Sequence, residues 1–141
     1  MSFFVKKQYQ TGLLDGSKPK EGRFFEKNTK TGNKVLNRKQ GDVVVFQGWQ
    51  MILWWKVEER NVYPCASEML NAEGYNFFLP LATNKFQALT TYYNICNPGS
   101  QLSSLDGAER LVEAWDEKIR KNKNTGFCSW SGRPTRVKFI V

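Results

Sequence analysis

Residues 43–60, VVVFQGWQMILWWKVEER, contain the strongest strand signal in the chain. Residues 43–46 are three β-branched residues and a phenylalanine, a run that suits a buried strand. Gly48 interrupts this run, and apolar residues resume at 51–55. We therefore predict two strands in this stretch, with a turn or a bulge at Gly48.

Two neighbouring tryptophans, Trp54 and Trp55, lie in the second of these strands. Successive side chains of a strand point to opposite faces of the sheet, so the two rings cannot both enter one core. One ring is therefore expected to be partly exposed or to pack under a second layer. An exposed tryptophan beside Lys56 would suit stacking on the bases of single-stranded nucleic acid, whereas packing of both rings in covered layers is the alternative.

The best helix signal covers about residues 105–123. Apolar residues recur there at the three- and four-residue spacing of one helical face. Acidic residues come early and basic residues late, an order that complements the helix dipole. The apolar stripe consists of Leu105, Ala108, Leu111, Val112, Trp115 and Ile119.

Weaker signals predict the other elements. Residues 22–39 are expected to form a hairpin whose turn lies at 28–32. The remaining predictions are strands at 3–5, 76–81 and 136–141 and short helices at 66–73 and 84–95. The predicted fold class is α+β: a mostly antiparallel sheet with one long amphipathic C-terminal helix, about 105–123, and one or two shorter helices. A single domain is expected to span residues 1–141.

The residue types that are absent or rare exclude several classes of function. There is no histidine, which excludes Ser-His-Asp and Cys-His nucleophile systems and mixed Cys/His zinc sites. Three cysteines cannot form a four-cysteine zinc site. No apolar run approaches the roughly 18 residues that a membrane span needs, and none follows Lys6 and Lys7 as in a signal peptide. We therefore expect a cytoplasmic, non-catalytic protein with no cofactor, no metal and no membrane contact.

The charge is concentrated at the two ends of the chain. Residues 1–40 carry a net charge of +7, residues 41–117 carry −6, and residues 118–141 carry +7. If the two ends fold next to each other, they form one positive face. Such a face is typical of proteins that bind nucleic acid, and it also fits an acidic protein surface.

The leading hypothesis is therefore a basic nucleic-acid-binding protein, non-specific for sequence and favouring single strands. Zinc fingers, aromatic RNA-binding signatures and GXXG clamps are absent from the sequence, so we predict no sequence readout. Residues 16–22 have two glycines and two lysines but lack the Gly-Lys-Ser/Thr ending of a phosphate loop. The predicted nucleic-acid-binding residues are Lys27, Lys30, Lys34, Arg38, Lys39, Trp54, Trp55, Lys56, Arg60, Lys118, Arg120, Lys121, Lys123, Arg133 and Arg136.

Other hypotheses remain open. A small inhibitor or regulator, of the kind that viruses and plasmids encode, would present the same basic face to an acidic surface of a larger protein. A small metal-dependent nuclease would use Asp42, Glu58 and Glu59 with Lys56, although their spacing matches no known pattern. The lysines and arginines could also serve only to solvate loops. The acidic residues of the predicted helix could neutralise a basic patch of a second copy in a homo-oligomer.

Overall fold

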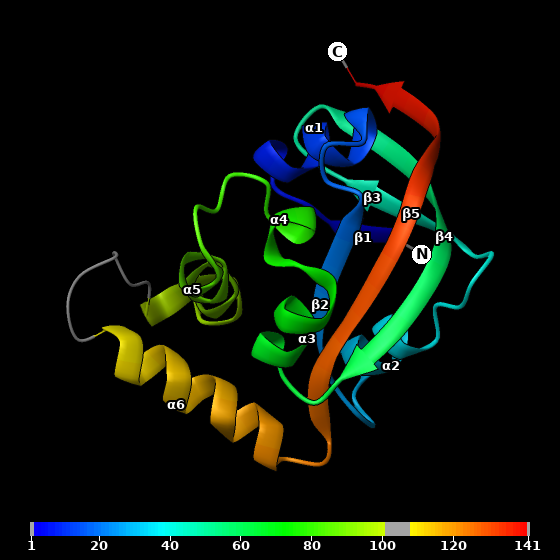
Figure 1. Ribbon diagram of the computed structural model, residues 1–141. Coiled ribbons are helices and arrows are strands. Elements are labelled where there is room, and N and C mark those ends of the chain that lie inside the picture. Colours follow the sequence, from blue (N-terminus) through cyan, green and yellow to red (C-terminus); the bar gives the residue numbers. More distant parts are fainter. Residues whose placement is uncertain (1, 101–107, 141) are drawn as a thin grey trace.

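The computed structural model describes residues 2–100 and 108–140, which contain a mixed five-stranded sheet that curls into a half-barrel (Figure 1). The strand order is β1-β3-β4-β5-β2, so β1 and β2 are the two edges. β1 pairs with β3 in parallel, and the other three pairings are antiparallel. The strands are β1 (Ser2–Phe4), β2 (Lys20–Glu26), β3 (Val43–Gln47), β4 (Met51–Tyr63) and β5 (Thr125–Phe139).

The two longest strands, β4 and β5, produce the curl. Their pairing shifts register between Trp54 and Trp55 and again between Val57 and Glu59. Such irregularities bend a strand and increase its twist. Gly132 permits a close approach at the bend, because a Cβ there would lie 2.2 Å from the backbone oxygen of Lys56.

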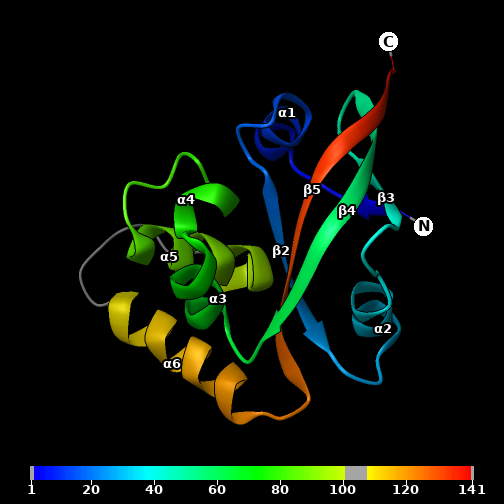
Figure 2. The same cartoon turned by 45° about the vertical axis from the view of Figure 1, so that its right-hand side comes forward.

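The helices lie on both sides of this sheet. α3, α4, α5 and α6 form one group beside the lower half of β2 and β5, while α2 lies on the other side (Figure 2). Among residues 2–100 and 108–140, no helix has both the length and the hydrophobicity of a membrane span. The helices are α1 (Lys7–Asp15), α2 (Lys30–Leu36), α3 (Ala66–Glu73), α4 (Tyr75–Phe78), α5 (Lys85–Cys96) and α6 (Ala108–Lys121), with a short 3-10 turn, η1 (Pro98–Ser100).

One apolar core fills the inside of the curled sheet. Phe46, Leu53 and Trp55 project into it and are fully buried. The ring centroids of Phe46 and Trp55 are 5.6 Å apart in a tilted contact. Leu13 of α1 and Val35 of α2 pack into the same core. Helices on the concave side of the sheet therefore take the place that further strands have in a closed barrel.

A second core lies between the sheet and the group α3–α6. Phe127 projects into it from the opposite face of β5. The ring centroid of Phe127 lies 5.6 Å from that of Tyr92 on α5 and 6.0 Å from that of Trp115 on α6, both in edge-to-face contacts. Val112 and Ile119 of α6 are buried in the same core. Both faces of β5 are therefore covered along its first half.

The predicted fold class is wrong. The sheet is mixed, because β1 runs parallel to β3. The amphipathic stripe predicted over about 105–123 lies partly in α6, but this helix is not the C-terminal element, since β5 follows it. The described residues contain six α-helices rather than one long helix and one or two short ones. Residues 105–107 of the predicted helix lie outside the described residues.

The hairpin predicted at 22–39 is also wrong. β2 pairs with β5, a strand one hundred residues later in the chain, and α2 occupies the place of the second arm. The Thr29 side chain caps this helix by accepting a hydrogen bond from the backbone N–H of Gly32. Burial of Val35 then anchors α2 in the core. A local cap and a tertiary contact outweigh the turn residues that suggested a hairpin.

Five further predictions concern the remaining segments. The strand at 43–46 and the helices at 66–73 and 84–95 are confirmed by β3, α3 and α5. The strand at 76–81 is wrong, because its first half belongs to α4. The terminal strand at 136–141 is far too short, since β5 already begins at Thr125. α1 was not predicted.

Candidate functional site

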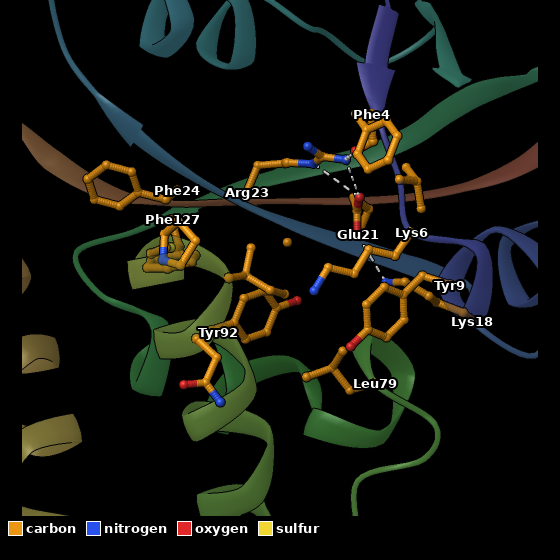
Figure 3. A pocket seen from close by; sticks show the side chains of 16 residues that line it. Phe4, Lys6, Tyr9, Lys18, Glu21, Arg23, Phe24, Leu79, Tyr92 and Phe127 are labelled. Atoms are coloured by element: carbon orange, nitrogen blue, oxygen red, sulfur yellow. Dashed lines mark hydrogen bonds and ion pairs between the residues drawn. The ribbon is translucent and has the colours of Figure 1, made fainter. Parts of the chain in front are cut away.

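A cavity of about 380 Å³ lies where the two edges of the half-barrel meet the helical group (Figure 3). Its lining comes from the end of β1 and the start of α1, from β2, from the end of α5 and from Phe127 of β5. Segments far apart in the sequence thus form its wall. Ligand sites in proteins typically have volumes of about 300–1,000 Å³, so this cavity has the size of a small-ligand site.

A cluster of three charged side chains, two buried and one half-buried, lies in the wall of this cavity. Lys18 is only 2% exposed, and its Nζ donates to Glu21 Oε1 at 3.1 Å and to the carbonyl oxygen of Lys20 at 2.7 Å. Arg23 donates to Glu21 Oε2 from Nε at 3.0 Å and from Nη2 at 2.8 Å. Arg23 Nη2 also donates to the carbonyl oxygen of Phe4 at 3.0 Å. The guanidinium therefore joins the two edges of the half-barrel.

The alternation of β2 places these side chains. Glu21 and Arg23 are two residues apart and share the face that looks into the curl, where the Arg23 guanidinium lies 5.3 Å from the ring centroid of Phe3. Gly22 points the other way, toward α5. A Cβ on Gly22 would lie 2.6 Å from the hydroxyl oxygen of Tyr92. A side chain at position 22 is therefore incompatible with the present position of the tyrosine hydroxyl.

Electrostatics within the cluster favour an ionised Glu21. Burial by itself opposes ionisation, but the charges of Lys18 and Arg23 outweigh it and hold the pKa of Glu21 below its ordinary value. Burial lowers the pKa of Lys18, and the charge of Glu21 opposes this shift without reversing it. At neutral pH the cluster therefore contains a carboxylate bound from two sides by cationic side chains.

Tyr92 presents an unsatisfied polar group to the cavity. Its side chain is 4% exposed, and its hydroxyl has no hydrogen-bond partner among the described residues. Leaving a buried hydroxyl unpaired costs about 1–3 kcal/mol. Burial, with Glu21 as a further cause, raises the pKa of Tyr92 well above its ordinary value, so the hydroxyl stays protonated. In Figure 3 the hydroxyls of Tyr92 and Tyr9 and the amine of Lys6 all point toward the same open space.

Large apolar side chains surround the mouth of the cavity. Phe4 is 72% exposed, Ile95 is 43% exposed and Phe24 is 36% exposed, and all three line the cavity. Cys96 lies deeper, and burial raises the pKa of its thiol to about 12, so it is not a thiolate at neutral pH. The site therefore combines an aromatic and aliphatic rim with hydrogen-bonding groups inside.

The fold of this chain resembles two solved structures. The crystal structure of hypothetical protein PH0355 has 21% sequence identity, covers 94% of this chain and 95% of its own, and has a TM-score of 0.59. The solution NMR structure of protein PF0455 from Pyrococcus furiosus has 18% identity, covers 96% of this chain and 99% of its own, and has a TM-score of 0.56. No protein-family model and no curated protein matches the chain. At these identities the two likenesses concern the fold alone.

The basic residues predicted for a hairpin lie on and around α2 instead. Lys34 is held by the sheet, since its Nζ donates to the carbonyl oxygen of Ser2 and lies 4.3 Å from the ring centroid of Phe3. The other members of this group are Lys27, Lys30, Arg38 and Lys39. None of the five lines the cavity.

The aromatic residues of β4 have different positions. Trp55 is fully buried in the core inside the curl, so it is not available to stack on a base. Trp54 lies on the opposite face, with the guanidinium carbon of Arg136 at 4.6 Å from its ring centroid. Arg60 donates from Nη2 to the carbonyl oxygen of Leu36 at 2.8 Å and so connects β4 with α2. Of the two tryptophans considered for base stacking, Trp54 and Trp55, only Trp54 lies on an outer surface.

The basic residues at the end of α6 form a third, separate group. Arg120 pairs with Glu68 at 3.2 Å and with Glu117 at 3.5 Å. Lys121 is within 3.9 Å of Glu117, and Lys118 and Lys123 are exposed. α6 and α2 lie on opposite sides of the sheet (Figure 2). The structure therefore does not bring the basic residues at the end of α6 together with the basic residues on and around α2, the α2 group.

The acidic residues proposed for a nuclease do not converge. Asp42 Oδ2 accepts a hydrogen bond from the backbone N–H of Lys39 at 2.8 Å. Glu58 lies 4.0 Å from Arg133, and Glu59 is exposed. Within residues 2–100 and 108–140, no three His, Cys, Asp or Glu side chains are grouped so that they could hold a metal ion.

Sequence reasoning missed the cavity residues Lys18, Glu21, Arg23 and Tyr92. One signal was present: Glu21, Arg23 and Phe25 alternate in the sequence, although Glu21 precedes the hairpin predicted at 22–39, and in a strand such alternation puts two charged residues on one face with a phenylalanine. Charged residues at core-facing positions are rarely buried unless they are paired, and such pairing often marks a functional site. Tyr92 had no comparable signal.

Proposed function

We propose that this chain binds single-stranded nucleic acid and that one nucleotide of the strand enters the cavity. The observation that carries the proposal is the buried Tyr92 hydroxyl, which faces the cavity without a partner among the described residues. Buried polar groups are nearly always paired, and a ligand group in the cavity that accepts from this hydroxyl would satisfy it. The formal net charge of +8 favours a polyanionic ligand.

The polar groups of the cavity suit a nucleotide. An ammonium group has three N–H donors, and Lys18 uses two of them for Glu21 and for the carbonyl of Lys20. Its third N–H, the amine of Lys6 and the hydroxyl of Tyr92 can donate to oxygen acceptors. Carbonyl oxygens of a base and phosphate oxygens are such acceptors. Because Glu21 is occupied by two cations, we assign it a positioning role rather than a contact with the ligand.

The exposed rim favours a nucleotide within a strand. Phe4 and Phe24 are large rings at the mouth of the cavity, where bases adjacent to the bound nucleotide would lie. Stacking of a base on an aromatic side chain contributes about 1–3 kcal/mol per base and is tolerant of sequence. A base within a duplex is stacked and paired and must be extruded before it can enter a pocket, which costs a few kcal/mol. Single strands should therefore bind more tightly than duplexes.

A cytoplasmic location belongs to the same proposal. Cys65, Cys96 and Cys128 are all free. Proteins of reducing compartments keep their cysteines unpaired. A cytoplasmic location gives the protein access to nucleic acid, the ligand proposed for the cavity.

Fluorescence anisotropy with a labelled single-stranded oligonucleotide and its duplex tests the proposal. Tyr92→Phe removes only the unpaired hydroxyl and should weaken single-strand binding by about fivefold, equivalent to about 1 kcal/mol, without loss of stability. Tyr75→Phe is the matched control, because the Tyr75 hydroxyl bonds to the carbonyl of Thr83 and does not line the cavity. Absence of binding at low salt, or equal affinity of the two variants, would contradict the proposal.

A further inference from the structure

A second surface of interest lies on the outer face of the sheet, on β3, β4 and β5. Cross-strand register places three rows of side chains there, because directly opposed residues share a face. The central row contains Val45, Trp54 and Arg136. The two flanking rows contain Val43, Lys56 and Arg133, and Gln47, Ile52 and Lys138.

This face is open, in contrast to the other face of the same strands. Leu53, Trp55 and Val57 point into the curl and are fully buried. On the outer side, Val43, Arg136 and Lys138 are exposed. The upper half of β4 and β5 extends beyond the group α3–α6, which covers only the lower half (Figures 1 and 2). The outer face of the upper half is therefore accessible.

The charge of this face is almost uncompensated. It carries Lys56, Arg133, Arg136 and Lys138. Among these, Arg133 has an acidic neighbour, Glu58 at 4.0 Å, which is the upper limit for an ion pair. In the described part of the chain, the other three form no ion pair. Several cationic side chains without acidic partners on one sheet face suit the binding of a polyanion.

Contact with the Trp54 ring fixes the position of the Arg136 guanidinium. The guanidinium carbon lies 4.6 Å from the ring centroid, so the cation covers a face of the indole. A guanidinium on an aromatic face keeps its N–H donors free at the edge, and these donors match the geometry of phosphate. The ring face that Arg136 covers is not available to a base. Trp54 therefore positions the Arg136 guanidinium.

We propose that this outer face binds the phosphate backbone of nucleic acid at a site separate from the cavity. Arg136 and Lys138 are two residues apart on one strand, about 7 Å, which is comparable with the separation of successive phosphates along a strand. Contacts to phosphates carry no sequence information. The inference rests on the proposed function only in taking nucleic acid as the ligand. A protein partner fits less well, because hot spots of protein interfaces need desolvated aromatic anchors and the aromatic residue here is covered by a cation.

The test uses a pair of double variants with the same change of charge. Arg136→Ala/Lys138→Ala removes the two outer-face cations, and Lys118→Ala/Lys121→Ala removes two exposed cations of α6. Binding of a labelled thymidine 20-mer and of a labelled thymidine trinucleotide is measured by anisotropy from about 0.05 to 0.5 M salt, a range over which salt increasingly screens charge interactions. If each outer-face cation contacts one phosphate, the 20-mer should bind about 25-fold more weakly at 0.1 M salt, and the salt slope should fall by about 1.4. The trinucleotide should bind unchanged.

A third variant tests the role of Trp54. Trp54→Leu keeps the charge of Arg136 but removes the ring that holds it, so 20-mer affinity should fall by less than in the double variant while the salt slope stays the same. Far-ultraviolet circular dichroism verifies that each variant is folded. Equal losses in the two double variants, or no loss in either, would overturn the inference. Tighter binding of a glutamate homopeptide than of the 20-mer would also overturn it, in favour of an acidic protein.

The outcomes for the two sites are distinguishable. If wild type fails to bind the trinucleotide and Tyr92→Phe leaves 20-mer binding intact, the cavity proposal fails. Selective loss of 20-mer binding in Arg136→Ala/Lys138→Ala would then still support the outer-face site. If the trinucleotide binds and this double variant behaves as wild type, the outer-face inference fails alone.

Discussion

Replacing Glu21 by glutamine should destabilise the fold strongly, although the side chain keeps its shape. Glu21 accepts hydrogen bonds from Lys18 and Arg23, and the change leaves both cations without their counter-ion. Removal of one partner from a buried ion pair typically costs about 3–5 kcal/mol. We expect the lower end, about 3 kcal/mol, because the Arg23 side chain is still 24% exposed and water can solvate it.

Urea denaturation followed by tryptophan fluorescence measures this loss. With a denaturant slope of about 2 kcal/mol per molar, a loss of about 3 kcal/mol lowers the midpoint by about 1.5 M. Glu113→Gln on the exposed side of α6 is the matched control and should change the free energy of unfolding by less than about 0.5 kcal/mol. A loss of less than about 1 kcal/mol for Glu21→Gln would refute the view that the cluster depends on its carboxylate.

Two further predictions concern the same region. Gly22→Ala should lower the free energy of unfolding by about 1–3 kcal/mol, because its Cβ would lie 2.6 Å from the Tyr92 hydroxyl and 2.7 Å from Met69 Cε. Gly99→Ala is the control, because a Cβ there would have no atom within 4 Å, and it should leave the same urea titration unchanged. Because the pKa of Glu21 is lower in the folded state than its ordinary value of 4.5, its stabilisation is complete above about pH 4.5 and is lost as the pH falls below that value. Thermal unfolding between pH 3 and 7 should therefore show wild type approaching Glu21→Gln at the acid end, and a constant difference between them would argue against this assignment.

Local patterns were sufficient for the strands of residues 43–60 but not for the strand that pairs with them. β5 includes Gly132 and Pro134, residues that normally argue against a central strand. Pro134 is tolerated because it lies at the register shift opposite Trp55, where the ladder is already interrupted. Only the partner strand reveals that shift, so the length of β5 could not be predicted from its own residues.

Alternation along β4 was informative but incomplete. It required Trp54 and Trp55 to lie on opposite faces, and the structure agrees. Which ring enters the core depends on Phe46 and the other side chains inside the curl, and therefore on tertiary packing. Similarly, the cavity depends on the approach of Tyr92 to Gly22, two residues seventy positions apart. No local spacing encodes such a contact.

The distribution of charge predicted one positive face on the condition that the two ends of the chain fold next to each other, and the α2 and α6 residues do not meet this condition. The α2 group and the end of α6 are on opposite sides of the sheet. Proximity of the two ends of a chain depends on topology, and here β5 carries the last basic residues away from α6 along the whole sheet. Basic residues near the chain ends therefore form several surfaces rather than one.

A titration of isotope-labelled protein with a thymidine trinucleotide, followed in the two-dimensional ¹H–¹⁵N spectrum, tests directly whether a nucleotide occupies the cavity. Occupation of the cavity by one nucleotide should shift the backbone amide signals of Lys6, Gly22, Phe24 and Ile95, which line it. The same signals should shift less in Tyr92→Phe at equal ligand concentration. Shifts confined to the exposed lysines of α6, with the cavity signals unmoved at millimolar ligand, would contradict the claim.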